Sequence, residues 1–475
     1  MTPVSLTEPR TIHFVGAGGA GMSGLVRLAL AAGHKVTGSD RADSATLADL
    51  RALGADVWAG HDASRLGTSA GGSPDLVVVS TAIRADNTEL AGARELGLPV
   101  LRRIELLAAL MRGRTGIAVA GTHGKTTTTA MVTLMLRAAG LDPSYAIGGD
   151  VLGGVNAAAG TGPHFVAEAD ESDGSFLELD PAIAVVTNVE ADHLDHWGDL
   201  AAVQAAFHAF AGRLPAGGTL VLCADDPGAA ALAGAVRPGC LVRTYSTVEG
   251  VAADLVATDL VAGGAGSTFT VATRAGPLGP VELPQPGRHN VANALAAAGA
   301  AMAAGAPFDA VQHALAGWTG VARRFQARGQ AGGVTLVDDY AHHPTELAAT
   351  LAAARLGAWA RVVAVFQPHL SSRTAAFADD FGRALTLADV AVVTDVYAAR
   401  EDPRPGVTGE LVAAAARHWG PDQLEVVYQG DRAALAATVA GLARPGDLVL
   451  SLGAGDVTTL ADELVPLLGA EGGPP

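Results

Sequence analysis

The sequence predicts an α/β protein with three domains, and three observations support this. Short β-branched runs that end in glycine alternate with helical stretches rich in alanine and leucine, which is typical of βαβ units on parallel sheets. The chain has 475 residues, and at roughly 150 residues per domain it should form about three domains. Glycine-rich loops follow the opening strands of two blocks, as nucleotide-binding α/β domains require.

The first domain is expected at residues 1–113. Its strands read TIHFV, KVTGSD and PDLVVV, and the helix IELLAALM closes it. Gly16, Gly18 and Gly21 form G-x-G-x-x-G directly after the first strand, while Asp40 ends the second. In a Rossmann-like domain such glycines let the backbone approach a pyrophosphate, and the acid holds a ribose. The pattern predicts a diphosphate site without naming the nucleotide; a tight turn that binds nothing is the alternative.

The second domain is expected at residues 114–321. Strands are predicted in GIAVAG, FVAEADES, AIAVVTNVEADH and TLVLCADD, followed by the hairpin region STFTVATRAGPLGPVELPQPG and an alanine-rich helix. The first of these strands leads into the loop A-G-T-H-G-K-T-T-T-T. The chain holds only two lysines, Lys35 and Lys125, and the second lies in this loop.

This loop predicts an ATP site. Gly121 and Gly124 free the turn, and Lys125 can reach terminal phosphates. The hydroxyl of Thr126 is placed to ligate magnesium. The full Walker pattern would have glycine where the chain has Val119, so only the shorter G-x-x-G-K-T is present.

Acidic residues and histidines follow the next two strands. Because ligand sites in α/β proteins lie at the carboxyl ends of parallel strands, we expect these two groups near the phosphates and their metal. A solvated acidic loop is the alternative for either group taken alone. The residues are Glu168, Asp170, Glu171 and Asp173 in the first group, and Glu190, Asp192, His193, Asp195 and His196 in the second.

The third domain is expected at residues 322–475, with strands in VTLVDDY, RVVAVFQPH, VAVVTDVY and DLVLSLGAGD. Just before it, Asn290 and Asn293 share one face of a helix start, where they could cap the helix or clamp a base or phosphate. At the junction, R-R-F-Q could deliver a cation to a transferring phosphoryl group. Further titratable side chains follow two strands of this domain: Asp338, Asp339, Tyr340, His342, His343, Glu346, His369 and Arg373.

Composition excludes some partners. The formal net charge of -17 disfavours nucleic acid and anionic membrane surfaces, because both would repel the chain. Cys223 and Cys240 lack CxxC spacing and are too few for a disulfide framework, which fits a reducing cytoplasm. We find no targeting or transmembrane segment, so a cytoplasmic protein is expected.

Taken in order, these motifs resemble the Mur ligases over nearly the whole chain. They are GAGGAGMSG, AGTHGKTTT, EADESDGSF, NVEADHLD, RHNVANALAA, RRFQ, DDYAHHPTE, FQPH and LGAGD. The resemblance implies a Rossmann-like N-terminal domain that binds a UDP-sugar, a P-loop ATPase-type central domain and a Rossmann-like C-terminal ligase domain that binds the amino acid. It is strongest to the branch in which ATP phosphorylates the lactyl carboxylate of UDP-N-acetylmuramate and L-alanine then attacks the acyl phosphate.

The same resemblance implies roles for individual residues, and also implies peptidoglycan synthesis, with its links to cell wall biogenesis, cell shape and cell division. The implied cofactors are ATP and Mg²⁺, with Mn²⁺ as a substitute. Catalytic residues would be Lys125, Glu168, His193, Arg324 and His342. Metal ligands would be Thr126, Glu168 and His193. The nucleotide would contact Gly121, Thr122, His123, Gly124, Lys125, Thr126, Thr127, Asn290, Asn293 and Asp339. Substrates would contact Gly16, Gly18, Gly19, Gly21, Met22, Ser23, Asp40, Ser80, Tyr340, His342, His369 and Arg373.

Lysine usage supports this branch, while two positions depart from the family pattern. Mur ligases that add later residues are described with a carbamylated lysine near the metals, and this chain has no lysine after Lys125. Leu370 stands where relatives commonly have arginine, and Arg400 stands where glycine is common. We hypothesise that Arg400 restores the lost cation at the amino-acid end of the site.

Three alternatives remain at this stage. The nearest is the related recycling ligase that attaches a preformed tripeptide to UDP-N-acetylmuramate. The second is an NAD-dependent dehydrogenase built on the first glycine loop, which leaves Lys125 and both acidic groups without a function. The third is a non-catalytic nucleotide switch, which has no need for His342, His343 and Arg373. For the quaternary structure we expect a monomer or a homodimer.

Overall fold

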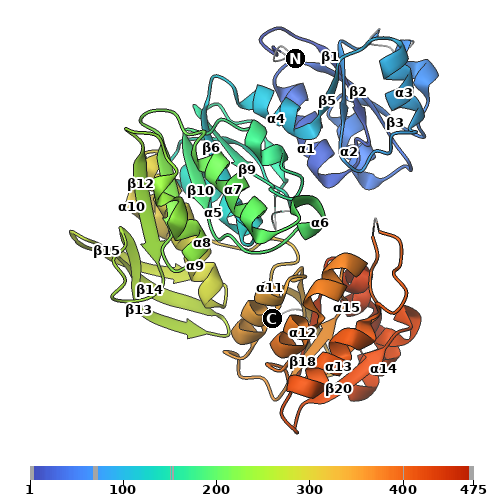
Figure 1. Cartoon of the computed structure of the whole chain (residues 1–475), viewed down its shortest axis with the longest axis vertical. Helices are drawn as coiled ribbons and strands as arrows, with labels where there is room; N and C mark the ends of the chain where they lie inside the picture. The colour runs from blue at the N-terminus through green and yellow to red at the C-terminus, as the bar shows by residue number, and fades with distance from the viewer. Residues whose placement is uncertain (1–4, 68–72, 150, 152–153, 400, 470–475) are drawn as a thin grey trace.

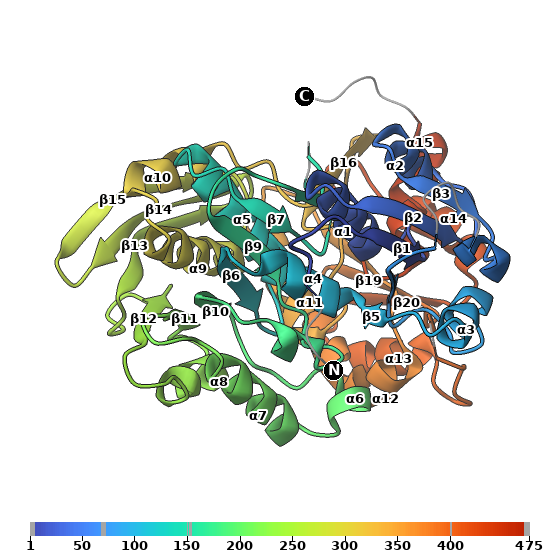
Figure 2. The same cartoon turned by 90° about the horizontal axis from the view of Figure 1, so that it is seen from above.

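The computed structural model describes residues 5–67, 73–149, 151, 154–399 and 401–469. Three sheets with their helices form three bodies along the chain, coloured blue, green to yellow, and orange in Figure 1. Viewed from above, the first body lies over the third and the central body lies to one side (Figure 2). The predicted three-domain α/β architecture is confirmed; its boundaries at 113/114 and 321/322 stay predictions.

The first sheet is parallel and has the strand order β3-β2-β1-β4-β5, which is the Rossmann order for its first five strands. Side chains of Ser44 and Asn87 cap α2 and α3 by accepting backbone hydrogen bonds. The strands are β1 Thr11–Val15, β2 Lys35–Asp40, β3 Asp56–Ala59, β4 Leu76–Val79 and β5 Val100–Arg102. The helices are α1 Ala20–Ala31, α2 Ala45–Ala52, α3 Thr88–Glu95 and α4 Arg103–Met111.

The central sheet has the order β15-β14-β13-β12-β11-β10-β6-β9-β7-β8, and its parallel part centres on β6. β14 pairs antiparallel with both β13 and β15 and forms the predicted hairpin region with them. These strands lie at one end of the central sheet (Figure 1). The strands are β6 Thr115–Ala120, β7 Ser144–Ala146, β8 Ala157–Ala158, β9 His164–Glu168, β10 Ile183–Val186, β11 Thr219–Cys223, β12 Leu241–Ser246, β13 Leu255–Gly263, β14 Gly266–Thr273 and β15 Gly276–Leu283. The helices are α5 Lys125–Ala138, α6 Leu194–Trp197, α7 Leu200–Ala211, α8 Pro227–Ala230, α9 Arg288–Ala303 and α10 Phe308–Ala316.

The third sheet has the order β16-β17-β21-β18-β19-β20, and only β16 runs antiparallel to its neighbour. Its inner strands are fully buried and rich in valine, as expected for strands covered on both faces. The strands are β16 Gln326–Ala331, β17 Val334–Asp339, β18 Val362–Phe366, β19 Val390–Thr394, β20 Glu425–Gln429 and β21 Leu448–Leu452. The helices are α11 Pro344–Ala354, α12 Ser371–Leu385, α13 Gly409–Trp419, α14 Leu435–Leu442 and α15 Leu460–Leu468. Short 3₁₀ helices lie at Ala63–Gly67, Ser175–Glu178, Ala231–Gly234, Arg432–Ala434 and Asp456–Thr459.

The apolar core is divided unequally among the three bodies. One continuous cluster of buried side chains runs from Ile12 in β1 to Val321, so the first two bodies share a core. The third body has its own clusters on the two faces of its sheet. Among the described residues, none of the helices is both long and apolar enough to cross a bilayer.

Candidate active site

The glycine-rich loop between β6 and α5 is held in one conformation by close packing. Gly124 has φ +79° and precedes α5, while Gly121 has φ +135°. A Cβ added at Gly121 would overlap the side chain of Thr187, and one at Gly124 would overlap that of Asn293. Residues with a Cβ rarely adopt such positive φ values, and there is no space for a Cβ at either position. Both positions therefore require glycine. The loop therefore approaches its surroundings as closely as a phosphate-binding loop must.

Lys125 lies at the centre of this site. Its Nζ donates to the carbonyls of Gly121 (2.7 Å) and Thr122 (3.1 Å), and it pairs with Glu171 Oε2 at 2.8 Å. Burial alone would lower the pKa of Lys125, but the charges of Glu171 and Asp170 raise it above its ordinary value. The ammonium is thus permanently charged, which suits a group that holds phosphate oxygens.

The two predicted acidic groups meet beside Lys125, because β9 and β10 flank β6 in the sheet. Thr126 Oγ1 donates to Glu168 Oε1 at 3.1 Å, and the backbone N–H of Gly148 donates to Glu168 Oε2 at 2.8 Å. Burial raises the pKa of Glu168. His193 has its Nε2 4.0 Å from Glu171 Oε1, and burial lowers the pKa of its imidazole.

A cavity of about 230 Å³ opens on the other side of the loop. Asn290, Asn293, Arg324 and Asp339 all line it, together with Tyr245. Asn290 donates to the carbonyl of Pro286 at 2.8 Å and is not the helix cap, which is Gly287. Burial raises the pKa of Asp339 to about 6, although the backbone N–H groups of Phe325 and Ala341 donate to it. The amide, carboxyl and aromatic side chains of this cavity could contact the base and ribose of a nucleotide.

A second cavity of about 390 Å³ lies in front of Lys125 and is lined by residues from all three bodies. Tyr340 and His342 form one wall, and Ala20 of α1 reaches it from the first body. His342 Nδ1 lies 2.9 Å from the carbonyl of Tyr340, so in the neutral ring this nitrogen carries the proton and Nε2 keeps a lone pair. Burial lowers the pKa of His342 to about 3, so the ring is neutral near pH 7. Arg324 lies 5.3 Å from the centroid of the Tyr340 ring.

A third cavity of about 270 Å³ is lined by residues of the first and the second body. It shares Ala20, Gly148, Glu168 and Asp170 with the second cavity. The second cavity in turn shares His123, Gly124, Arg324 and Glu346 with the first. The three cavities are therefore adjacent, and the second lies between the other two. Predicted substrate residues Gly19, Gly21, Met22 and Ser80 line the third cavity.

The remaining predicted residues of the first body support its glycine loop without lining these cavities. Asp40 accepts a hydrogen bond from the backbone N–H of Gly18 at 2.8 Å, and Gly16 has φ +81°. Ser23 is buried and donates to the carbonyl of Ala20 at 3.1 Å. The Asp40 carboxylate, which the sequence predicts to bind a ribose, thus holds the backbone of the glycine loop in this structure.

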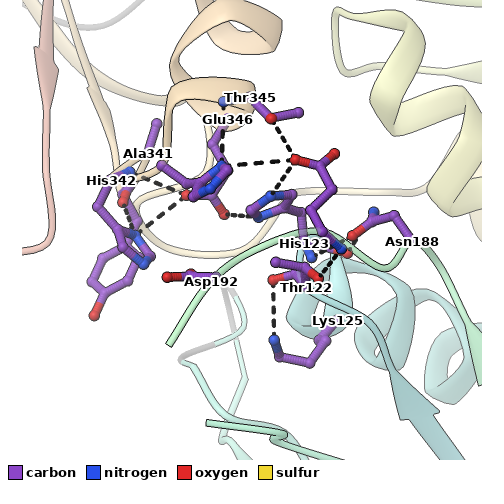
Figure 3. A network of polar contacts seen from close by, with 12 residues as sticks. Thr122, His123, Lys125, Asn188, Asp192, Ala341, His342, Thr345 and Glu346 are labelled. Atoms are coloured by element: carbon purple, nitrogen blue, oxygen red, sulfur yellow. Dashed lines mark hydrogen bonds and ion pairs between the residues drawn. The ribbon is translucent and has the colours of Figure 1, made fainter. Parts of the chain in front are cut away.

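Polar contacts join the second and third bodies around the glycine-rich loop (Figure 3). His123 Nδ1 lies 3.3 Å from Glu346 Oε1, and the hydroxyl of Thr345 donates to Glu190 at 2.6 Å. Arg324 Nη1 lies 3.5 Å from Glu346 Oε1. Glu346 therefore links the junction arginine to the loop, and its pKa is held well below its ordinary range despite burial.

A buried ion pair strengthens this junction. Arg373 of α12 contacts Asp192 Oδ1 at 2.7 Å, and each side chain is only 5% exposed. Burial alone would raise the pKa of Asp192, but the charge of Arg373 lowers it well below its usual range. His369 lies 3.4 Å from Arg373 and its ring is 6.0 Å from that of His342.

Of the two positions that depart from the family pattern, the structure describes Leu370 but not Arg400. Leu370 has φ +67° and is 4% exposed, and it lines a small cavity with Asp192, His193 and Arg373. An apolar side chain thus occupies this buried position. Arg400, which we hypothesised to replace that cation, lies outside the described residues.

Some residues at this site were not expected from the sequence. Asn188 accepts from the backbone N–H of His123 at 2.7 Å, and Gln285 donates to the carbonyl of Arg324 at 3.0 Å. Asn156 donates to the carbonyl of Ala20 at 2.7 Å and so joins the second body to the first. Asn188 lies two residues beyond the end of β10 and could have been selected by this strand-end position, whereas Gln285 and Asn156 carry no such signal.

Comparison with known proteins places these features in one family. Family models match residues 11–115 (Mur ligase family, catalytic domain), 119–301 (Mur ligase middle domain) and 323–455 (Mur ligase, glutamate ligase domain). UDP-N-acetylmuramate--L-alanine ligase of Kineococcus radiotolerans is 54% identical over 96% of each chain.

Solved structures agree. The UDP-N-acetylmuramate-alanine ligase of Thermotoga maritima is 29% identical, with a TM-score of 0.78 over 96% of this chain and 98% of that one. A murein peptide ligase of Psychrobacter arcticus is 26% identical, with a TM-score of 0.71 over 98% and 100%.

Proposed function

Because the chain belongs to the Mur ligase family, we propose that it joins the lactyl carboxylate of UDP-N-acetylmuramate to L-alanine in peptidoglycan precursor synthesis. The reaction consumes ATP, as in other members of this family of ATP-dependent ligases. The relatives named for this activity share about half of their residues with the chain over nearly its full length, which favours L-alanine over a tripeptide as the substrate.

The adjacency of the three cavities, which share lining residues, is the observation that carries the proposal. ATP would lie with its base and ribose in the cavity of Asn290 and Asp339 and its phosphates at Lys125. The sugar nucleotide would lie in the cavity beside Met22 and Ser80. The lactyl carboxylate then meets the terminal phosphate in the middle cavity, where the reacting groups must come together.

The chemistry requires an activated carboxylate, since an amine and a free carboxylate only form a salt. A carboxylate oxygen attacks the terminal phosphorus of ATP, and the bond from that phosphorus to ADP breaks. The amine nitrogen then attacks the carbonyl carbon of the acyl phosphate, loses its proton, and expels inorganic phosphate. Positioning and charge neutralisation supply most of the acceleration in such a transfer.

The charged residues of the middle cavity suit these steps. Lys125 would hold the phosphate oxygens, and Arg324 would neutralise charge on the transferring group. His342 keeps a lone pair on Nε2, so it can accept a hydrogen bond from the amine of L-alanine and orient it. Arg373 and Tyr340 would lie at the amino-acid end of the cavity.

Thr126, Glu168 and His193 fit a magnesium ion associated with ATP. Two hard oxygen ligands already lie 3.1 Å apart, and His193 Nδ1 is buried without a hydrogen-bond partner within the described chain. Neutralisation of charge on the phosphate oxygens is the chemistry that such an ion, Mg²⁺ or Mn²⁺, supplies. These residues would hold the ion, and Glu168 also accepts a hydrogen bond from the backbone N–H of Gly148.

We propose further that one chain carries a complete site, because residues of a single chain line all three cavities. A monomer and a homodimer would then be equally active. ATP supply and the two free cysteines fit the cytoplasm as the place of reaction.

A phosphate-release assay with single omissions tests the proposed function. Phosphate should appear only when UDP-N-acetylmuramate, L-alanine, ATP and Mg²⁺ are all present, and mass spectrometry should show the amide. Release with the tripeptide L-alanyl-γ-D-glutamyl-diaminopimelate but not with L-alanine would identify a recycling ligase instead. Reduction of NAD with no phosphate release would reject the ligase altogether.

A further inference from the structure

Two histidines and a carboxylate converge at the junction of the second and third bodies, apart from the residues assigned to magnesium. His123 belongs to the glycine-rich loop, Glu190 follows β10, and His343 precedes α11. One ligand atom of each lies within 4.8 Å of the others. His123 Nε2 is 3.6 Å from Glu190 Oε2, and His343 Nδ1 is 3.9 Å from the same oxygen. Figure 3 shows His123 beside Glu346 and Thr345 at this junction.

The hydrogen bonds of His343 fix its tautomer, and a metal ion at Nδ1 would replace the backbone N–H that this nitrogen now accepts. Nε2 lies 3.2 Å from the carbonyl of Ala191, which can only accept, so Nε2 carries the proton of the neutral ring. Burial lowers the pKa of His343, which favours that neutral ring. Nδ1 therefore holds a lone pair, and its present donor is the backbone N–H of Thr345 at 3.3 Å. A histidine that donates one N–H to a backbone carbonyl and offers the other nitrogen has the arrangement of a metal ligand.

His123 has the complementary arrangement. Its Nδ1 lies 3.3 Å from Glu346 Oε1, while its Nε2 is buried without a hydrogen-bond partner within the described chain. A carboxylate behind one nitrogen and an open second nitrogen are found in carboxylate–histidine–zinc triads. The ring centroids of His123 and His343 are 4.6 Å apart, and His123 Nε2 and His343 Nδ1 both lie within 4 Å of Glu190 Oε2.

The spacing is somewhat wider than that of a tetrahedral ion. Zinc bonds of about 2.0–2.1 Å to nitrogen and oxygen place neighbouring ligand atoms about 3.3 Å apart. The two separations from Glu190 Oε2 are 3.6 and 3.9 Å, and all three ligand atoms lie within 4.8 Å of one another, so the side chains must rotate inward to coordinate an ion. Two imidazoles and one carboxylate select zinc, cobalt or nickel, whereas magnesium prefers oxygen ligands.

We propose that His123, Glu190 and His343 form a second metal site, which binds a transition-metal dication such as Zn²⁺ and holds the third body against the second. Two ligands come from the second body and one from the third, so the ion cross-links them. Among the described residues, the apolar clusters of the third body are separate from the cluster of the first two, and polar contacts such as Arg373–Asp192 join the second and third bodies. One coordinated ion would add much to that interface. Because product release requires the bodies to separate, zinc should inhibit turnover by retaining the closed form.

Binding also displaces a proton. Burial alone would lower the pKa of His123, but Glu190 and Glu346 raise it to about 9, so the metal-free ring is charged at neutral pH. The ion takes the place of that proton between the same carboxylates.

The test measures metal binding directly and does not depend on ligase activity. The full-length protein, in excess Mg²⁺ to fill the oxygen-rich site, is titrated with CoCl₂ while the visible absorption of tetrahedral Co²⁺ is recorded, and ZnCl₂ is then added in competition. We expect a single ion per chain. His343→Asn should weaken binding at least 10-fold, because asparagine retains the helix cap but lacks the imidazole.

Two further variants separate ligand loss from misfolding. Glu190→Gln removes the ligand charge yet can still accept from Thr345, and it should weaken binding to a similar extent. His418→Ala removes an exposed histidine of the third body and should bind Co²⁺ as the unaltered protein does. Equal affinity in the unaltered protein and His343→Asn, or the absence of any tetrahedral absorption, would overturn the proposal.

A second measurement tests the cross-link. Small-angle scattering should show that Zn²⁺ shifts the unaltered protein toward its compact form and has no such effect on His343→Asn. Zinc that binds with the expected stoichiometry but leaves the scattering of both proteins unchanged would refute the clamp.

Discussion

Lys125 shows most clearly how one residue connects the sequence to the chemistry. It is buried among Glu168, Asp170 and Glu171 and contacts two loop carbonyls, so its charge serves the phosphate site and the local fold together. Replacing it leaves several carboxylates without their cation, and the structural and the catalytic consequence must be separated by experiment.

We expect Lys125→Met to reduce kcat by about 10²–10³-fold, because one preorganised charge contact to a transition state is typically worth that much. Phosphate release in the presence of all substrates measures this. Lys35→Met is the matched control, since Lys35 is the other lysine of the chain and is exposed at the start of β2. Undiminished turnover by Lys125→Met would contradict the assigned site.

His289 provides a pH-dependent test at the nucleotide cavity. Burial and the charge of Arg324 lower its pKa to about 4, while Glu346 acts in the opposite direction. A histidine with a depressed folded-state pKa stabilises the fold above its unfolded pKa of about 6.5, and that stability is lost as the pH falls toward 4.

We therefore expect acid to destabilise the unaltered protein more than His289→Gln, by at most about 3 kcal/mol between pH 6.5 and 4. Thermal unfolding of both proteins across this range measures the difference. A constant difference in melting temperature at all pH values would show that His289 does not titrate in this window.

Among the elements, α5 carries the phosphate loop at one end and an ordinary turn at the other. Gly124 precedes the helix with φ +79°, and Gly140 follows it with φ +71°. A Cβ at Gly124 would overlap Asn293, whereas one at Gly140 meets no atom within 4 Å. Alanine at Gly140 would therefore introduce backbone strain alone, whereas alanine at Gly124 would introduce both backbone strain and a steric overlap.

Gly140→Ala should cost only the left-handed backbone conformation, about 1–2 kcal/mol, with ATP binding unchanged. Gly124→Ala should cost more and should weaken ATP binding at least 10-fold, because the loop must move away from Asn293. Calorimetric titration with a non-hydrolysable ATP analogue compares the two. Equal ATP affinity in both variants would show that the close packing at Gly124 is unimportant.

At the scale of the whole molecule, the distribution of the core predicts which body moves. The first and second bodies share an apolar cluster, so they should move as one unit. The third is joined to the second mainly by polar contacts such as Arg373–Asp192, and these can break and form again during turnover.

Asp192→Asn should weaken closure, because removing one partner of a buried ion pair costs about 3–5 kcal/mol. We expect a larger radius of gyration by small-angle scattering and a lower kcat, with unchanged unfolding of the third body. Glu410→Gln breaks a pair of equal length, 2.7 Å to Arg417, that is 44% exposed on both sides and should change neither property. Identical scattering from both variants would refute a role for the Asp192 pair in closure.

The sequence alone determined the α/β class, the sheets as parallel units and the family, because strand periodicity and glycine loops are local patterns. It also selected Lys125, Glu168 and His193 as neighbours, since the ends of adjacent parallel strands meet at one sheet edge. The assignment of individual roles to these residues stays a prediction.

Only the tertiary structure decided which side chains meet across the bodies. The pairs Arg373–Asp192 and His123–Glu346, and the approach of His343 to Glu190, join residues far apart in the chain. The local sequence around each of these residues is compatible with many relative positions of the domains. Long-range packing and the compensation of buried charge select one of them, and neither is encoded within a short window of sequence.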